Sequence, residues 1–296
     1  MTRRFGWILN LDAELELSRG KSGYVAPRKL LAQLAEHGKS SRELLGPSDV
    51  LLDDSLRGAD GQRLSGLVGR AWCPTPLAIA ALDAYGVAPE PHPEAGVLRR
   101  VNHRLFAHEL GGGLPGQAYV QSREQLLAHL GNFEQRFLLK RPLSFAGRGQ
   151  LRSLGPFSEK QWSWVDVSLA RDGLLLEPLV EIELEVSLHG FVWRDGRHEL
   201  GNICRQLVGT RGTFQGVRRA HDSELTAAER SSLLEQGERV AHALARAGYF
   251  GPFGIDGYRY TIEGSASFCA LGEVNARYTL GFVTGFPRHP SELWLD

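Results

Sequence analysis

One stretch near the end of the sequence constrains the fold more than any other: residues 251–285, GPFGIDGYRYTIEGSASFCALGEVNARYTLGFVTG. Apolar and polar residues mix over Phe253–Ile262, small and polar residues fill Glu263–Ser267, and a second mixed run covers Phe268–Arg277. Two strand-like runs around a short turn predict a β-hairpin. We therefore expect a sheet with antiparallel strands at this end of the chain.

Four polar side chains of this hairpin are predicted to lie together. Side chains alternate between the two faces of a strand, so Glu273, Asn275 and Arg277 share one face, and Asp256 of the partner strand can lie opposite them. Two carboxylates and an amide oxygen are ligands that suit Mg²⁺, and an arginine offers a fixed positive charge to an anion. The other interpretation is a solvated strand face, and the hairpin alone does not decide between the two.

The composition excludes some classes of partner. The chain has 296 residues, of which 42% are hydrophobic and 23% charged, as in an ordinary globular protein of one to three domains. Lys+Arg and Asp+Glu both total 34, so no net field attracts the chain to nucleic acid or to an anionic membrane. We predict neither partner.

The cysteines and the first residues bear on the compartment. Cys73, Cys204 and Cys269 are odd in number and far apart, which argues against a disulfide framework or a zinc site. The first residues, MTRRFGWILNLDAELEL, contain polar residues within the apolar run, unlike a signal peptide, and no stretch approaches the length of a membrane span. We expect a cytoplasmic protein.

The first 95 residues alternate between strand-like and helix-like patterns. Phe5–Leu11 and Asp49–Asp53 are predicted strands, whereas Pro27–His37 and Leu77–Tyr85 carry helical spacing. This alternation predicts a small α/β unit with a mostly parallel sheet. The proline-rich stretch Pro89–Pro93 is a predicted boundary.

Further elements follow this boundary. A helix that begins with a capping box of Thr226 and Glu229 should end at Gly248, directly before the hairpin. The other predicted elements are helices over Val101–Leu110 and Arg123–Leu130, and strands over Arg136–Lys140 and Leu174–Glu177.

Two segments suggest nucleotide binding. Lys140 ends a predicted strand and is followed by a loop with Gly147 and Gly149, which lets backbone N–H groups approach phosphates. Glu177-Pro178-Leu179-Val180 is an extended segment whose free backbone groups could bind an adenine edge, and Glu185 follows eight residues after Glu177. Alternatively, the glycines form only a turn, and the acidic residues form an exposed strand face.

Taken in order, these features resemble the ATP-grasp superfamily. The order is Lys140 with its glycine loop, EPLV with Glu185, the capped helix, Asp256, and then Glu273-Val274-Asn275-Ala276-Arg277, which is similar to the family's E-x-N-x-R metal signature. The resemblance covers about residues 101–285. It implies a mixed α/β (α+β) fold with an N-terminal pre-grasp domain over 1–95, a lid subdomain with the glycine loop over 96–185, and a C-terminal subdomain with the metal site over 186–296.

The resemblance also implies a role for each residue of the series. The lysine would contact the α- and β-phosphates of ATP, the glycine loop would cover the β- and γ-phosphates, EPLV would bind adenine, and Glu185 would bind ribose. Mg²⁺ ions would lie on Asp256, Glu273 and Asn275, and Arg277 would stabilise an acyl phosphate. The residues implied for the nucleotide are Arg104, Lys140, Phe145, Gly147, Gly149, Glu177, Leu179, Val180 and Glu185.

Two arginine assignments are less direct. The family usually has a further nucleotide-binding lysine where this chain has Arg104, which can replace the charge but not the geometry of an ammonium group, and which could equally be a surface residue. A substrate carboxylate could bind an arginine by paired hydrogen bonds. The candidates are Arg205, which we rank first for its strand context, then Arg211, Arg218 and Arg219, whereas His189, His198 and His221 are predicted to be ordinary polar residues.

The resulting expectation is an ADP-forming ligase that takes ATP and Mg²⁺ and joins a small-molecule carboxylate to an amine or a thiol through an acyl phosphate. A carboxylate needs this activation because its leaving group would otherwise be oxide, and phosphoryl transfer depends mainly on positioning and charge neutralisation. The alternatives are a small-molecule kinase of the same fold and an ATP-binding module without turnover. A homodimer is the default expectation for a soluble enzyme.

Overall fold

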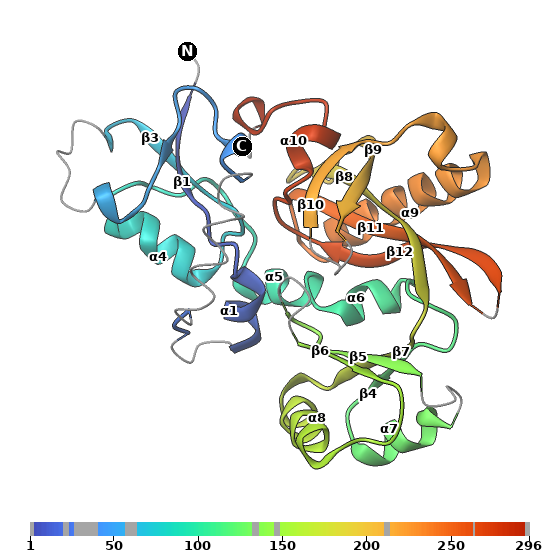
Figure 1. Ribbon diagram of the computed structural model, residues 1–296. Coiled ribbons are helices and arrows are strands. Elements are labelled where there is room, and N and C mark those ends of the chain that lie inside the picture. Colours follow the sequence, from blue (N-terminus) through green and yellow to red (C-terminus); the bar gives the residue numbers. More distant parts are fainter. Residues whose placement is uncertain are drawn as a thin grey trace.

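The computed structural model describes residues 3–19, 24–26, 41–56, 64–131, 136–144, 149–209, 214–262 and 264–293. These residues form three β-sheets with their own helices, grouped around a central pair of short helices (Figure 1). Among the helices described, none has the length and apolar character needed to cross a membrane.

The N-terminal unit is the predicted small α/β unit. Its parallel sheet has the order β2-β1-β3, with β1 at Arg4–Ile8, β2 at Val50–Leu51 and β3 at Leu67–Ala71. Its other elements are α1 (Ala13–Arg19), η1 (Arg42–Leu44), η2 (Asp54–Leu56) and α4 (Pro76–Ala84). The helix α4 begins with proline at its first position, where the missing N–H costs nothing. The helix expected over Pro27–His37 lies outside the described residues.

The second sheet has four antiparallel strands in the order β4-β7-β5-β6. Its core joins the buried face of the sheet to two helices through Val120, Leu126, Leu139, Val165 and Leu176. Of these helices, α8 has a full capping box of Ser158 and Gln161, and it was not among the helices predicted from the sequence. The elements are β4 (Ala118–Val120), α7 (Arg123–Leu130), β5 (Phe137–Lys140), β6 (Gln150–Ser153), α8 (Glu159–Asp172) and β7 (Leu174–Pro178).

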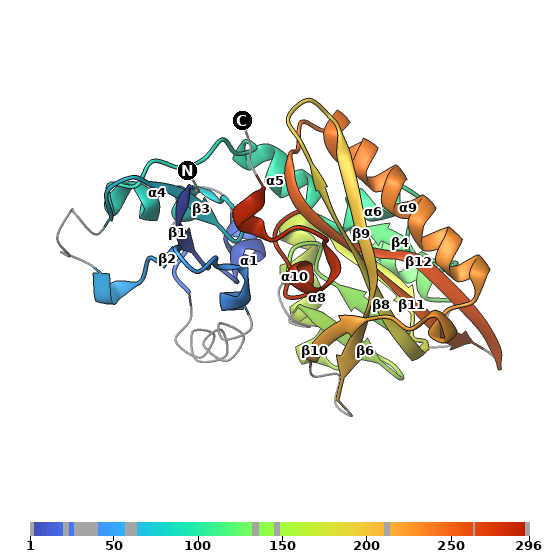
Figure 2. The same cartoon turned by 90° about the horizontal axis from the view of Figure 1, so that it is seen from above.

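The third sheet is the largest and contains the predicted hairpin. Its antiparallel order is β10-β9-β8-β11-β12, and α9 (Ala227–Arg246) covers one face (Figure 2). Val240 and Leu244 of α9 and Val186 and Leu188 of β8 belong to one buried cluster. The predicted capping box and the glycine at the end of α9 are both present. The strands are β8 (Glu181–Val192), β9 (His198–Val208), β10 (Phe214–Arg219), β11 (Gly251–Ile262) and β12 (Ser265–Asn275), with η3 (Asp222–Glu224) before α9.

The structure corrects the limits of the hairpin. Ile262 pairs with Ser265, so the turn is shorter than the predicted Glu263–Ser267, and Gly264 has a φ of +78°, which favours glycine. The second strand ends at Asn275 instead of continuing to Arg277. Arg277 therefore lies beyond the sheet.

The helix expected over Val101–Leu110 is two helices, α5 (Ala95–Val101) and α6 (Arg104–Glu109). At the break, the ring of His103 accepts a hydrogen bond from the N–H of Leu105 and so caps α6. Asn102 binds the C=O of Leu98 and both backbone groups of Ala276. The break thus attaches the helix pair to the end of β12. The chain closes with α10 (Phe282–Gly285) and η4 (Pro290–Glu292).

Candidate active site

Two carboxylates face each other on the hairpin, as predicted. Asp256 of β11 is the register partner of Glu273 of β12, and it accepts hydrogen bonds from Asn275 Nδ2 at 2.8 Å and from Gln206 Nε2 at 2.6 Å. Burial raises the pKa of Asp256 to about 7, and the charge of Glu273 contributes in the same direction. This pair carries mutual repulsion that a bound cation would relieve.

Arg104 is not a surface residue. Its side chain is buried, and one guanidinium nitrogen lies 3.0 Å from a carboxylate oxygen of Glu273. The other terminal nitrogen donates to Arg141 O and Ser144 Oγ, both at 2.6 Å. Arg104 therefore joins the metal-type carboxylates to the start of the loop that follows β5.

Lys140 and Glu177 come from adjacent strands of the four-stranded sheet. They form an ion pair in which the side chain of Glu177 is buried. After β7, the Leu179 N–H donates to Arg136 O, so this N–H is not free to bind adenine. The backbone of Val180 makes no hydrogen bond to a described residue, and its side chain packs on the cluster that includes Leu114 and Tyr260.

The loop between β5 and β6 is described only at its ends. Phe145 and Gly147 lie outside the described residues. Gly149 accepts a hydrogen bond from the Arg141 N–H at 2.8 Å and has a φ of +70°. A Cβ there would lie 2.9 Å from Ser144 Cβ. The loop therefore closes on itself at a position that requires glycine.

The face of β8 toward Asp256 is polar. Ser187 is the register partner of Asp256, and Glu185 is the partner of Tyr258, so both side chains lie on the Asp256 side of the sheet. Burial raises the pKa of Glu185, and the charge of Arg205 lowers it in part. Glu185 thus lies two residues along β8 from Ser187, the register partner of Asp256.

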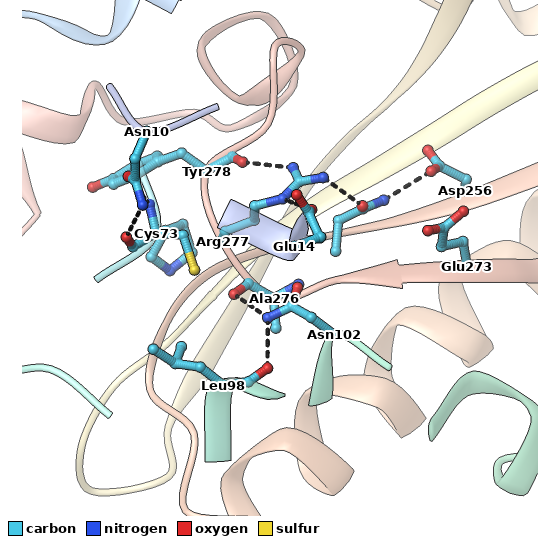
Figure 3. A network of polar contacts seen from close by, with 12 residues as sticks. Asn10, Glu14, Cys73, Leu98, Asn102, Asp256, Glu273, Ala276, Arg277 and Tyr278 are labelled. Atoms are coloured by element: carbon cyan, nitrogen blue, oxygen red, sulfur yellow. Dashed lines mark hydrogen bonds and ion pairs between the residues drawn. The ribbon is translucent and has the colours of Figure 1, made fainter. Parts of the chain in front are cut away.

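Arg277 connects the carboxylates to the N-terminal unit, as Figure 3 shows. It donates to Asn275 Oδ1 and to the Tyr278 C=O, both at 3.0 Å, and its third nitrogen binds Glu14 of α1. The same guanidinium lies 5.5 Å from the ring centre of Trp72. Although it lies beyond the strand, Arg277 still reaches the residues with which it was predicted to cluster.

Glu14 and Trp72 adjoin Arg277 and were not among the candidates from the sequence. Both are buried, and neither Glu14 Oε2 nor Trp72 Nε1 has a hydrogen-bond partner among the described residues. An unpaired buried polar atom carries a desolvation cost that a bound ligand could relieve. Glu14 lies in the first turn of α1, where an acidic residue is ordinary, so nothing in the sequence indicated its contact with Arg277.

The structure does not bring Arg205 to this group. Arg205 is the register partner of Val186, and its neighbour Gln206 reaches Asp256, so Arg205 points to the opposite face, toward η3 and α9. Arg218 lies on that face too and pairs with Glu224. Arg219, the partner of Cys204, is exposed on the Asp256 side, and Arg211 lies outside the described residues. The ranking of Arg205 first was wrong because residue type does not determine the face of a strand.

His189 is a buried part of this face. Its ring nitrogens lie 3.1 Å from Ser187 Oγ and 3.0 Å from Thr279 Oγ1. Burial lowers its pKa to about 4, so the ring is neutral near pH 7. Gly281 and Gly285 pack against the ring with no room for a Cβ, and the histidine therefore fixes the segment that follows Arg277.

Comparisons with known proteins find similar structures but no similar sequence. No protein-family model matches the sequence, and no curated protein sequence matches it. Among solved structures, D-alanyl-alanine synthetase A from Vibrio cholerae aligns with a TM-score of 0.58 and 14% identity over 99% of this chain and 94% of its own. Biotin carboxylase from Campylobacter jejuni aligns with a TM-score of 0.57 and 10% identity over 94% and 66%. N5-carboxyaminoimidazole ribonucleotide synthetase from Thermus thermophilus aligns with a TM-score of 0.51 and 20% identity over 93% and 72%.

The chain has the ATP-grasp fold. The match extends over the N-terminal unit, the four-stranded sheet and the large sheet, so the expected fold class is confirmed. One predicted boundary needs correction, because residues 185 and 186 both lie inside β8 and a division there would split a strand. We propose that the ATP-grasp lid subdomain ends between β7 and β8.

Proposed function

We propose that the protein is an ATP-dependent ligase that converts a small-molecule carboxylate into an acyl phosphate and transfers the acyl group to an amine, with release of ADP and phosphate. The observation that carries this proposal is the position of Arg277. It contacts Asn275 beside the carboxylate pair on one side and Glu14 on the other. The Arg277 guanidinium thus lies between the carboxylate pair, which suits metal-bound phosphate, and a second polar site at Glu14.

The residues near the lid suit a nucleotide. Lys140 and Arg104 supply two positive charges along the path from β5 to the hairpin, and the backbone of Val180 is available to an adenine edge. Glu185 lies on the same face as the carboxylates, at a position suited to ribose hydroxyls. One structural neighbour was solved as a beta-gamma-ATP complex and another with ADP and magnesium, which supports ATP as the nucleotide.

The donors on the hairpin fit Mg²⁺. Asp256 and Glu273 offer carboxylate oxygens that face each other. Mg²⁺ is usually held by only one or two protein carboxylates, together with waters and phosphate oxygens. Asn275 can add its amide oxygen if that atom leaves its contact with Arg277. Bound there, Mg²⁺ would neutralise charge on the phosphate oxygens.

In the proposed reaction, Arg277 and Glu14 act on the acyl phosphate and on the acceptor. The substrate carboxylate attacks the γ-phosphorus of ATP, the bond to ADP breaks, and Arg277 faces the acyl phosphate that forms. The neutral amine then attacks the acyl carbon, the bond from that carbon to the phosphate oxygen breaks, and the departing phosphate takes up the proton that the nitrogen loses. Glu14, with one oxygen unpaired beside Arg277, would bind the ammonium form of the acceptor and accept the proton that frees its nitrogen to attack.

The test is ADP release measured with a panel of amino acids, short peptides and hydroxy acids. We expect release that requires both a carboxylate and an amine, and a product with an amide bond by mass spectrometry. A stable phosphorylated product formed without an amine would show a kinase instead. ATP binding without turnover over the whole panel would show a binding module.

A further inference from the structure

A second cluster of ligand-type side chains lies on the large sheet, away from the site described above. His198 is the first residue of β9, and Glu238 and His242 belong to α9. One ligand atom from each of the three lies within 4.8 Å of the others. The Nε2 atom of His198 is 2.6 Å from Glu238 Oε2, and the two imidazole centres are 4.7 Å apart.

The fold itself brings these residues together. Glu238 and His242 are four residues apart on a helix and so lie on one face of it, and α9 covers the sheet face toward which His198 points. The sequence shows only the helical pair, because the third member lies on a different element. For this reason the sequence predicted His198 to be an ordinary polar residue, whereas the structure places two further ligand-type side chains beside it.

The charges around the cluster favour a cation. Arg197 pairs with Asp195, and Arg288 pairs with Glu199, so the neighbouring guanidinium groups are matched by carboxylates of their own. Among the described residues, Glu238 has only the His198 ring as a polar side-chain partner. An open cavity of about 750 Å³ borders His198 and His242, which leaves the imidazole groups accessible from solvent.

We propose that His198, Glu238 and His242 bind a divalent transition-metal ion of the zinc type. Two imidazole nitrogens and a carboxylate oxygen are the donors that Zn²⁺, Co²⁺ and Ni²⁺ prefer over Mg²⁺. Three protein ligands leave a coordination position for water. The ion would tie the start of β9 to the last turns of α9.

This site is separate from the nucleotide site. His198 and Gln206 lie on the same strand, eight positions apart, which is about 26 Å at about 3.3 Å per residue. Gln206 is the residue of β9 that reaches Asp256. A metal ion at His198 therefore cannot contact phosphates at Asp256, and its binding should not depend on ATP.

Titration of the full chain with Co²⁺, after removal of metals by a chelator, tests the proposal. We expect one equivalent to bind, with a visible absorption band from nitrogen and oxygen ligands, and a large excess of Mg²⁺ should not displace it. His242→Ala and Glu238→Gln should weaken binding by at least roughly 10- to 100-fold. This is the loss of metal affinity that follows when only a hydrogen-bond partner of a metal ligand is changed. Both side chains are exposed, so these variants should fold.

The matched control is His129→Ala, which removes a histidine near the end of α7. It should bind Co²⁺ like the wild type. Circular dichroism and ADP release with Mg²⁺ should be unchanged in all three variants. Failure of the wild type to bind micromolar Co²⁺, or equal binding by the wild type and the two cluster variants, would show that His198 and Glu238 form only a hydrogen-bonded pair.

Discussion

The substitution Asp256→Asn should make the metal-free protein more stable at neutral pH while it removes activity. Burial raises the pKa of Asp256 from 3.8 to about 7. Because the folded-state pKa is raised, the folded protein holds a proton that the unfolded chain has lost between these two values. Stability therefore falls as pH rises through this window, by about 1.4 kcal/mol per pH unit. Below the unfolded pKa no such loss remains.

The size of the effect follows from the width of the window. Three units give an upper limit of about 4 kcal/mol, and since Asp256 is partly exposed we expect roughly 2–4 kcal/mol. Asparagine removes this loss but offers one acceptor oxygen where Asp256 accepts from both Gln206 and Asn275, which costs about 1–3 kcal/mol at every pH. The variant should thus be less stable than the wild type near pH 5 and more stable near pH 8.

The assay is the thermal midpoint of both proteins from pH 5 to pH 8 with a chelator present. A difference of 2–3 kcal/mol across this range corresponds to roughly 4–12 °C. Addition of Mg²⁺ with a nucleotide should raise the midpoint of the wild type at pH 8 and leave the variant nearly unchanged. If the difference between the two midpoints does not change with pH, the argument that burial and Glu273 act on Asp256 is refuted.

Three further predictions concern the nucleotide, the metal and the acceptor. Glu273→Gln should reduce substrate-dependent ADP release by at least roughly 100-fold, whereas Glu181→Gln, which changes an exposed carboxylate on β8, should have little effect; equal rates in both would disprove the metal assignment. Gly149→Ala should raise the KM for ATP because alanine at a φ of +70° costs about 1–2 kcal/mol and meets Ser144, and Gly131→Ala, where a Cβ has open space, is the control. Glu14→Gln should raise the KM of the amine by roughly tenfold or more through loss of a charged contact and leave the KM of ATP unchanged; an unchanged amine KM would exclude Glu14 from the acceptor site.

The sequence predicted local and ordered features well. The hairpin, the capped helix α9 and the facing of Asp256 and Glu273 follow from alternation, capping and turn residues within short segments. The ATP-grasp assignment followed from the order of such segments. These signals depend only on neighbouring residues, so they can be read from the sequence without knowledge of the remaining fold.

What the sequence did not predict depends on contacts between distant segments. The face on which Arg205 lies is set by the register of β9 against β8, and Arg205 itself carries no sign of it. Glu14 reaches Arg277 across 263 positions of sequence. The helix break at Asn102 and His103 exists because their side chains bind Ala276 and cap α6, which no helical periodicity would reveal.

Asn102 also explains how the chain can leave the sheet between two site residues. Ala276 separates Asn275 from Arg277, and the amide of Asn102 occupies both its N–H and its C=O. One side chain thus does for Ala276 what a neighbouring strand does elsewhere in the sheet. A graft that exchanges the N-terminal unit for another should therefore place its junction before Asn102, since a junction placed after Asn102 would separate Arg277 from the contact that directs it.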